Sequence, residues 1–248
     1  MTRSLTALPV YNEVRYVQRV LAEVKQYSDD VLVVDDGSTD GTTALLAVEP
    51  GIQVISHPQN RGYGAALRTA FAYAIEQGYD HLVTIDCDGQ HEPQRIPRFL
   101  QAAKTADIVS GSRYLKTYPG DHQPPAQRRW INQQVTAELN RRLGLSLTDA
   151  FCGFKAYRVD ALRNLELTED GYAMPLELWV QAVKAGLEII EMPVPLIYLD
   201  ASRSFGGALD DATTRLNYYH SVLDRSIAAA GLADEGCTKR MACGKGVG

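Results

Sequence analysis

The chain lacks the cysteine patterns of a zinc knuckle or a disulfide-bonded scaffold. Its 248 residues contain four cysteines, and no two of them form a Cys-x-x-Cys pair. Cys87, Cys152, Cys237 and Cys243 are widely spaced, which is typical of reduced thiols rather than of metal ligands or disulfides. We therefore interpret them as small, partly buried apolar side chains.

Long apolar runs are also missing. No segment reaches the ~18 uninterrupted apolar residues of a membrane span. The short apolar stretch near the start ends at Pro9, too soon for a signal peptide. From this we expect a cytoplasmic protein, with peripheral adsorption to the inner face of the membrane as the alternative.

Positive charge is scarce and scattered. The formal net charge is -5, and the Lys and Arg residues form no cluster. Nucleic-acid binding normally depends on massed positive charge, so we expect no nucleic-acid partner. The 45% of hydrophobic residues can build a sizeable core, and we expect one large domain rather than two small ones.

Short β-branched runs alternate with helical patterns through the first half of the chain. This alternation predicts an α/β fold with a mostly parallel sheet flanked by helices. We expect strands at residues 5–10, 31–34, 53–56, 81–85, 108–110, near 154–157 and within 187–199, the last at a sheet edge because of its prolines. We expect helices at residues 14–24, after 38–40, and at 62–77, 128–143, 175–185 and 210–230. Residues 114–127 should form a long loop and residues 232–248 a flexible tail.

Acidic and amide side chains follow two of the predicted strands. Asp35 and Asp36 come after the second strand, and Asp86, Asp88 and Gln90 come after the fourth. Ligands of open parallel sheets bind at the carboxyl ends of the strands. If residues 86–90 stay extended, their alternation puts three oxygens on one side, as Mg²⁺ or Mn²⁺ requires. Taken alone, the segment also fits a solvated Asp-Gly turn.

Six motifs follow one another along the chain: PVYNE at residues 9–13, VVDDGSTDGT at 33–42, NRGYGAA at 60–66, DCDGQH at 86–91, GSRY at 111–114 and DAFCGFK at 149–155. In this order they resemble the family 2 glycosyltransferases of the GT-A fold, and within them the dolichol- or polyprenol-phosphate sugar transferase branch. The resemblance implies a single Rossmann-like GT-A domain over residues 1–231. Residues 1–112 would form its nucleotide-binding half and residues 113–231 its acceptor half.

The resemblance also implies roles for individual residues. It assigns nucleotide-sugar binding to Pro9, Tyr11, Glu13, Val34, Asp36, Asp86 and Cys87, and the metal to Asp86, Asp88 and Gln90. It assigns the acceptor to Arg203 and to one of Arg128 and Arg129, without a choice between the two, and catalysis to Asp88, Arg113, Asp149 and Glu177. For a hydroxyl acceptor, Asp149 or Glu177 would be the general base. His91, beside the metal set, is a candidate for a role near the metal or the leaving group, whereas His57 is expected to have no functional role.

The implied activity is metal-dependent transfer of a sugar, with inversion, from a GDP- or UDP-linked donor to a polyprenyl or dolichyl phosphate. One segment departs from that branch, because residues 200–207 read DASRSFGG where a Gly-x-Ser-Lys stretch is expected. Two alternatives therefore remain: transfer to a soluble hydroxyl acceptor, and an inactive nucleotide-sugar-binding module. A nucleotidyltransferase is disfavoured because no Gly-rich, Arg-containing loop follows the first strand.

Overall fold

The computed structural model describes residues 2–199 and 204–232. Its strands are β1 (Ser4–Val10), β2 (Asp30–Asp35), β3 (Gln53–Ser56), β4 (His81–Thr84), β5 (Ile108–Ser112), β6 (Lys155–Arg158) and β7 (Ile189–Pro193). Its α-helices are α1 (Val17–Val24), α2 (Thr42–Val48), α3 (Tyr63–Glu76), α4 (Ile96–Ala102), α5 (Ala126–Leu143), α6 (Val159–Leu162), α7 (Met174–Lys184) and α8 (Ala212–Ala230). Two short 3₁₀ helices, η1 (Pro93–Arg95) and η2 (Gly207–Asp210), complete the described elements.

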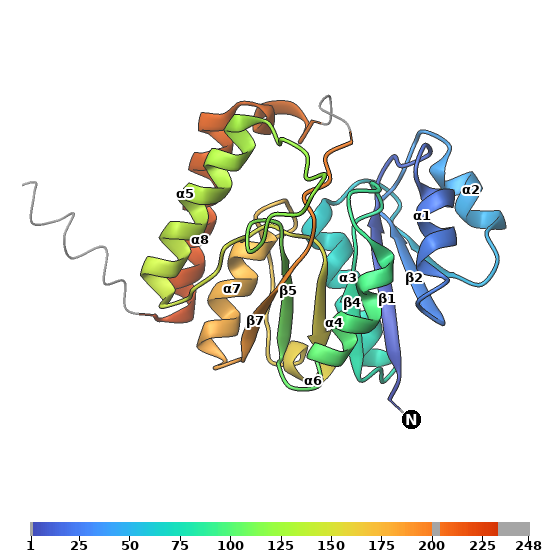
Figure 1. The fold of residues 1–248 in the computed structure, drawn as a ribbon, viewed down its shortest axis with the longest axis horizontal. Helices are drawn as coiled ribbons and strands as arrows, with labels where there is room; N and C mark the ends of the chain where they lie inside the picture. The colour runs from blue at the N-terminus through green and yellow to red at the C-terminus, as the bar shows by residue number, and fades with distance from the viewer. Residues whose placement is uncertain (1, 200–203, 233–248) are drawn as a thin grey trace, which may run out of the picture.

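One seven-stranded sheet runs through the molecule, with the strand order β3-β2-β1-β4-β6-β5-β7 (Figure 1). Of its six strand pairs, two are antiparallel, and both involve the single reversed strand β6, which lies between β4 and β5. The other pairs are parallel. The prediction of an α/β fold with a mostly parallel sheet is confirmed, as is the edge position of the proline-containing strand β7.

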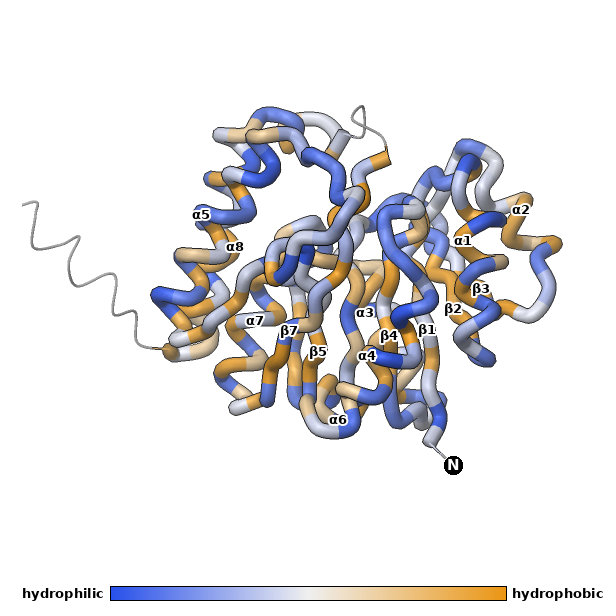
Figure 2. Tube along the Cα trace, in the orientation of Figure 1, coloured by the Kyte–Doolittle hydropathy of each residue, from blue (hydrophilic) through white to orange (hydrophobic). Residues whose placement is uncertain are grey.

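The strands alternate their side chains between two hydrophobic layers. In β2, Leu32 and Val34 pack into the layer that contains α3, α5, α7 and α8. Val31 and Val33 pack into the opposite layer, which contains α1 and α4. This period of two is what a strand buried on both faces requires. Figure 2 shows the resulting concentration of hydrophobic residues along the central strands.

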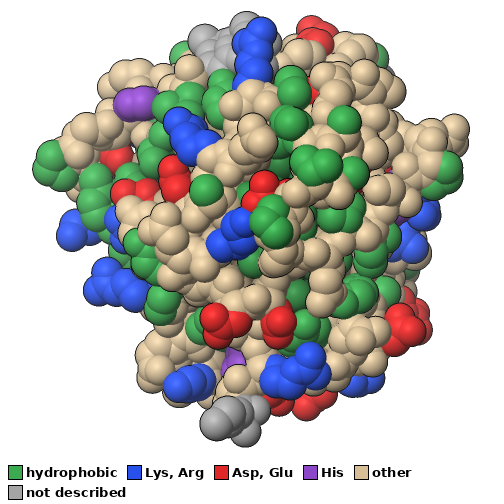
Figure 3. Space-filling model, turned by 90° about the vertical axis from the view of Figure 1, so that its right-hand side faces the viewer, with side chains coloured by type: hydrophobic (Ala, Val, Ile, Leu, Met, Phe, Trp, Pro, Cys, Tyr) green, Lys and Arg blue, Asp and Glu red, His purple; other side chains and the backbone are tan. Residues whose placement is uncertain are grey.

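Outside this core the surface is mixed in charge. On the face over α1 and α2, basic and acidic side chains are interspersed, and no patch of one sign dominates the described residues visible there (Figure 3). Within residues 2–199 and 204–232, the helices are all too short or too polar to cross a membrane.

Candidate active site

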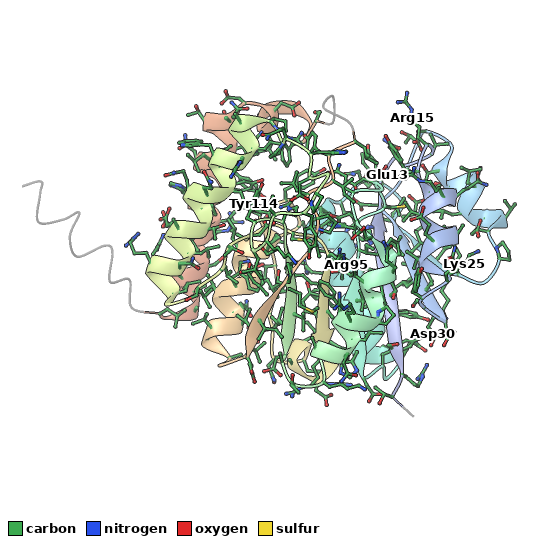
Figure 4. The ribbon with its side chains drawn as sticks, viewed as in Figure 1. Glu13, Arg15, Lys25, Asp30, Arg95 and Tyr114 are labelled. Atoms are coloured by element: carbon green, nitrogen blue, oxygen red, sulfur yellow. The ribbon has the colours of Figure 1, made fainter. Side chains whose placement is uncertain are left out.

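A cavity of about 670 Å³ opens at the carboxyl ends of the parallel strands. Residues after β1, β2, β4, β5 and β7 line it, together with Phe151, which precedes the reversed strand β6. Because β6 runs the other way, the residues before it reach the same edge of the sheet. Glu13, which follows β1, and Tyr114, which follows β5, both lie at this edge (Figure 4).

The part of the cavity wall formed at the carboxyl ends of β1, β2 and β4, called here the donor end, is acidic. The residues that the sequence assigned to nucleotide binding and that line this end are Pro9, Tyr11, Glu13, Asp36, Asp86 and Cys87. Val34 does not join them, contrary to the expectation, because the alternation of β2 turns it into the core layer beside α3, where it is fully buried. Tyr11 is 44% exposed, so its ring face is available for stacking on a base.

Asp36 holds the loop that leads into α3. Its carboxylate accepts hydrogen bonds from the backbone N–H groups of Arg61 and Gly62 at 2.9 and 2.7 Å, and from His57 Nδ1 at 2.6 Å. His57, for which the sequence suggested no role, therefore helps to fix Asp36. Asp35 is used within its own turn, where it accepts from Ser38 N–H at 3.0 Å and from the hydroxyl of Thr43 at 2.6 Å.

The loops after β1 and β2 are joined to each other by paired hydrogen bonds. Asn12 takes a left-handed conformation with φ 57°. Its N–H donates to the Ser38 hydroxyl at 2.9 Å, and its side-chain oxygen accepts from Thr39 N–H at 2.8 Å. The N–H of Glu13 donates to the Thr42 hydroxyl at 2.9 Å. These bonds fix the two loops that flank the donor end.

The Asp86 carboxylate sits between two side chains that donate to it. Tyr63 Oη donates to one oxygen at 3.0 Å, and His91 Nε2 lies 3.3 Å from the other. Burial opposes the charge of Asp86, but hydrogen bonding and attraction from His91, with the bond from Tyr63, outweigh it and lower the pKa of the carboxyl. Asp86 is therefore an anion at neutral pH.

Residues 86–90 form a turn and do not continue β4, which ends at Thr84. The expected alternation of an extended strand is therefore wrong. Gly89 takes φ +73°, and Asp88 Oδ1 accepts a hydrogen bond from the N–H of Gln90 at 2.9 Å. The turn still brings Asp86, Asp88 and Gln90 to the wall of the same cavity.

This donor set fits a hard divalent cation. Among the described residues, no three His, Cys, Asp or Glu side chains lie close enough together to form a metal site by themselves. A metal here would rely on the carboxylates of Asp86 and Asp88, the amide oxygen of Gln90 and oxygens of a bound ligand. Mg²⁺ is held in this way when a few carboxylates and substrate phosphates complete its shell.

Arg113 is fixed to Asp149 by a two-pronged ion pair. Its Nε and Nη2 atoms lie 2.7 and 2.9 Å from the two carboxylate oxygens. Asp149 is fully buried, and burial disfavours its charge, yet Arg113 more than compensates and holds the pKa of Asp149 well below its usual range. Arg113 lines the cavity, and Asp149 lies behind it.

Neither candidate general base is placed to take a proton at the cavity. Asp149 also accepts from Asn132 Nδ2 at 2.7 Å and from Phe151 N–H at 3.2 Å, so its oxygens are occupied. Glu177 lies outside the cavity wall and accepts from the N–H groups of Thr168 and Glu169 at 2.8 and 2.7 Å. Each carboxylate holds local structure: Asp149 positions Arg113, and Glu177 fixes the loop before α7. Their assignment to catalysis stays a prediction.

The part of the cavity wall that contains Arg113, Arg128 and Arg215, called here the acceptor end, is cationic. Arg128 lines it, whereas Arg129 does not and lies over the ring of Tyr114. Arg203 lies outside the described residues. Arg215, on the first turns of α8, joins Arg113 and Arg128 on the cavity wall. No motif marks Arg215, because it occurs inside an ordinary helical pattern.

A row of aromatic rings links the two ends. Tyr63, bonded to Asp86, stacks on Tyr172 with ring centres 5.9 Å apart. Tyr172 meets the edge of Phe205 at 5.3 Å, and the guanidinium groups of Arg128 and Arg215 lie 4.7 and 4.4 Å from the Phe205 ring centre. Tyr63 lies in the motif at residues 60–66, whereas Tyr172 and Phe205 come from segments without a motif.

Sequence comparison identifies relatives along most of the chain. The model of the family "Glycosyl transferase family 2" matches residues 6–166. An undecaprenyl-phosphate mannosyltransferase of Micrococcus luteus is 34% identical over 86% of this chain and 92% of its own. A polyprenol monophosphomannose synthase of Mycolicibacterium smegmatis is 32% identical over 77% of this chain and 76% of its own.

Structural comparison agrees on the fold. Glucosyl-3-phosphoglycerate synthase from Mycobacterium tuberculosis, solved with Mn²⁺, UDP and glucosyl-3-phosphoglycerate, has a TM-score of 0.69 to this chain at 20% identity. The match covers 95% of this chain and 82% of that one, and the expected GT-A fold is confirmed. Because the family match spans more than half of the 248 residues, the chain belongs to glycosyl transferase family 2 and is a glycosyltransferase.

Proposed function

We propose that this chain transfers a sugar from a nucleoside diphosphate donor to a polyprenyl phosphate, with inversion and with the help of a divalent metal ion. The observation that carries the proposal is that carboxylates and guanidinium groups from different segments of the chain line one cavity. Carboxylates of Asp86 and Asp88 line the donor end, and guanidinium groups of Arg113, Arg128 and Arg215 line the acceptor end. The names of the Micrococcus and Mycolicibacterium relatives support the same acceptor class.

The distribution of acidic groups favours an anionic acceptor over a neutral hydroxyl. Among the described residues, the acidic side chains that line the cavity are Glu13, Asp36, Asp86 and Asp88, all at the donor end. A hydroxyl acceptor needs a base beside it, and Asp149 and Glu177 are both engaged elsewhere. A phosphate monoester is already an anion and needs no such base, and a guanidinium fork matches its oxygens.

The reaction follows from this arrangement. A phosphate oxygen of the acceptor attacks the anomeric carbon and forms a new C–O bond while the bond to the donor diphosphate breaks. The nucleoside diphosphate leaves with the electron pair, and no proton transfer is required. The acceptor-end arginines hold the attacking phosphate, and an inverted anomeric centre results from one in-line displacement.

The metal would be held by Asp86, Asp88 and Gln90. When bound, a divalent ion neutralises the negative charge that develops on the departing diphosphate. The protein's own part is to keep Asp86 ionised, through Tyr63 and His91, so that the donor end is ready to bind a cation.

A polyprenyl chain stays in the bilayer, so the proposal places the acceptor end of the cavity toward a membrane surface. Leu115 and Trp130 are 44% and 49% exposed. Each is next in sequence to a cavity residue, Leu115 to Tyr114 and Trp130 to Ile131. These are the apolar side chains that we expect to meet lipid.

A product screen tests the proposal. The protein is incubated with UDP- and GDP-linked sugars, Mn²⁺ or Mg²⁺, and either a polyprenyl phosphate or a soluble hydroxyl acceptor. We expect sugar transfer to the phosphate alone, and loss of transfer when the metal is chelated. Transfer to the hydroxyl acceptor with none to the phosphate would refute the acceptor assignment.

The metal assignment is tested by Asp88→Ala. We expect nucleoside diphosphate release to fall by roughly two orders of magnitude or more, because charge on the leaving group would no longer be stabilised. Asp160→Ala, at a side chain that is 86% exposed on α6, is the matched control and should leave release unchanged. Normal release from the Asp88 variant would remove the basis for the metal site.

A further inference from the structure

One lysine is buried close to the active site without a carboxylate partner. Lys155, the first residue of β6, is 3% exposed and is not part of the cavity wall. Among the described residues, its Nζ donates a hydrogen bond to the backbone carbonyl of Cys152 and lies 5.4 Å from the ring centre of Trp179. Neither partner is a carboxylate. A buried ammonium group is costly unless its surroundings compensate for lost water, so the place of Lys155 calls for an explanation.

The backbone that Lys155 contacts has no regular structure. Residues 149–154, called here the connecting segment, belong to no helix or strand. Three backbone carbonyls of this segment accept hydrogen bonds from buried side chains instead. The donor and acceptor pairs are Lys155 with Cys152, Trp179 with Ala150 at 3.0 Å, and Thr84 with Gly153 at 2.9 Å. Because buried carbonyls need partners, the shape of the connecting segment depends on these side chains.

The connecting segment positions charged groups of both parts of the cavity wall. Asp149, at its start, forms the two-pronged ion pair with Arg113. Gly153, near its end, lies against the carboxylate of Asp86, where an added Cβ would overlap both oxygens. A displacement of the segment would therefore move a donor-end carboxylate and an acceptor-end arginine together.

The surroundings of Lys155 stabilise an ammonium group in particular. The face of a tryptophan ring attracts a cation, and a carbonyl oxygen accepts a stronger hydrogen bond from a charged donor than from a neutral one. Burial lowers the pKa of Lys155, while Cys152, Asp149 and Asp86 act in the opposite direction. The charge of Lys155 thus acts on two carboxylates of the site without being paired to either.

We propose that Lys155 is a positioning residue, which holds the connecting segment and thereby sets the places of Asp86 and Arg113 at the same time. It acts through the carbonyl of Cys152 and touches neither donor nor acceptor. The inference rests on the proposed function only for the choice of substrates in the rate assay.

Lys155→Met tests the inference in the reaction, because methionine is unbranched and adaptable but has neither the charge nor the donor. We expect kcat to fall by about tenfold to a hundredfold, since the reacting groups are displaced. Both KM values should stay within about threefold, because the groups that bind the substrates are still present. Lys184→Met, at an exposed lysine on the last turn of α7, is the matched control and should keep the wild-type kcat. A wild-type kcat for the folded Lys155 variant would overturn the inference.

A second measurement needs no substrate or metal. The thiol of Cys152 is fully buried, so its modification by iodoacetamide, followed by peptide mass spectrometry, reports opening of the connecting segment. We expect modification to be about tenfold faster or more in Lys155→Met, because a hydrogen bond from a charged group is lost. Lys155→Arg, which keeps charge and donors, should recover part of the protection.

Cys87 is the internal reference for this measurement, since it is buried in the same hydrophobic layer but lies outside the connecting segment. An equal increase at both thiols would mean general destabilisation and would overturn the positioning role. So would unchanged protection of Cys152.

Thr84→Val is an independent variant, which decides the matter if Lys155→Met does not fold. It removes the hydroxyl that donates to the Gly153 carbonyl. We expect the same pattern, a lower kcat with faster modification of Cys152. Wild-type values of both quantities would show that the connecting segment does not position the site.

The outcomes separate this inference from the proposed function. If wild-type protein transfers sugar to a polyprenyl phosphate and Lys155→Met does so with the same kcat, the proposed reaction stands and the inference fails. If wild-type protein uses only a soluble hydroxyl acceptor and Lys155→Met has a lower kcat with it, the inference stands and the acceptor assignment fails. If wild-type protein transfers sugar to neither, the modification of Cys152 alone decides the role of Lys155.

Discussion

At the scale of single residues, Gly153 leaves room for the Asp86 carboxylate. A Cβ atom added at Gly153 would overlap both oxygens of Asp86. The carboxylate would have to move, together with its contacts to Tyr63 and His91. Gly153, just before β6, therefore matters to the donor end because it has no side chain.

We expect Gly153→Ala to reduce turnover by about a hundredfold, because a shift of about 1 Å at a reacting group has effects of this size. Steady-state rates with a nucleotide sugar and polyprenyl phosphate provide the measurement. Gly144→Ala is the control, since an added Cβ there meets no atom within 4 Å. It should cost about 1 kcal/mol of stability, owing to its φ of +68°, and leave turnover intact. Full turnover in the Gly153 variant would mean that the position of Asp86 does not matter.

Asp149 makes the free energy of unfolding depend on pH. Its pKa is depressed in the folded state, where burial opposes its charge but Arg113 outweighs burial. A depressed pKa contributes stability above the unfolded pKa of about 3.9, and this contribution is lost as pH falls toward the folded value. The contribution is therefore complete at neutral pH and declines only in acid.

We expect Asp149→Asn to be less stable than wild type by about 3–5 kcal/mol at pH 7, because Arg113 loses its buried partner. Between pH 5 and pH 3 the difference should shrink by about 1 kcal/mol as the wild-type carboxylate begins to lose its advantage. Urea unfolding of both proteins at pH 5 and pH 3 measures this difference in the free energy of unfolding. A difference that grows in acid would contradict the assigned direction of the pKa shift.

Residue identities predicted the donor end better than the acceptor end. Tyr11, Asp36 and Asp86 follow strand ends within short motifs, so their convergence could be expected from the sheet alone. Arg215 and Phe205 lie in segments without a motif and meet only through the packing of η2 and α8. The oxygens of Asp149 and Glu177 accept hydrogen bonds from neighbours that cannot be identified from the spacing of residues in the sequence.

At the scale of elements, the loop before α7 contributes to the cavity wall and is held by hydrogen bonds to α7 and α8. Glu177 accepts from the hydroxyl of Thr168 at 2.8 Å as well as from the N–H groups of Thr168 and Glu169. Glu169 in turn accepts from Tyr218 and Arg225 of α8 and from Gly171 N–H. The loop carries Tyr172 into the aromatic row, so these bonds position a ring that lines the site.

Glu177→Gln separates this holding role from the role of a general base. With only one oxygen left as acceptor, we expect a loss of about 1–3 kcal/mol in the free energy of unfolding. Turnover should stay within about threefold of wild type, whereas removal of a general base typically costs about 10²–10⁴ in rate. Chemical unfolding and initial rates measure the two effects. A rate loss in the latter range would restore Glu177 as a base.

The positions of the strands were predictable, but the direction of one was not. Residues 5–10, 53–56 and 108–110 form strands within two residues of the expected bounds, because a strand buried on both faces reads as a β-branched run. β6 was expected near residues 154–157, yet its antiparallel insertion between β4 and β5 depends on contacts across the sheet. That reversal brings Gly153 and Phe151 to the active-site edge.

At the scale of the whole molecule, both hydrophobic layers share one sheet, and the cavity draws on both halves of the chain. A nucleoside diphosphate at the donor end should therefore stabilise the entire fold. At a ligand concentration of about 100 Kd the gain is roughly 2.7 kcal/mol. For a chain of this size, that corresponds to a rise of about 5–10 °C in Tm.

Calorimetric melting with UDP and GDP, with and without Mn²⁺, measures this shift and identifies the preferred base. We expect one cooperative transition, with a shift for at least one nucleotide that requires the metal. Asp88→Ala should melt like the wild-type protein without ligand and show little shift. A shift of equal size in that variant would contradict metal-assisted binding of the diphosphate.

The left-handed Asn12 links the first two loops before any substrate arrives. Because of its hydrogen bonds with Ser38 and Thr39, the two loops, called here the rim, are ordered during folding. Nucleotide binding then needs no disorder-to-order step. The rim therefore works as a preorganised receptor. The rate at which a nucleotide associates with the protein should be governed by diffusion and electrostatics rather than by a conformational search.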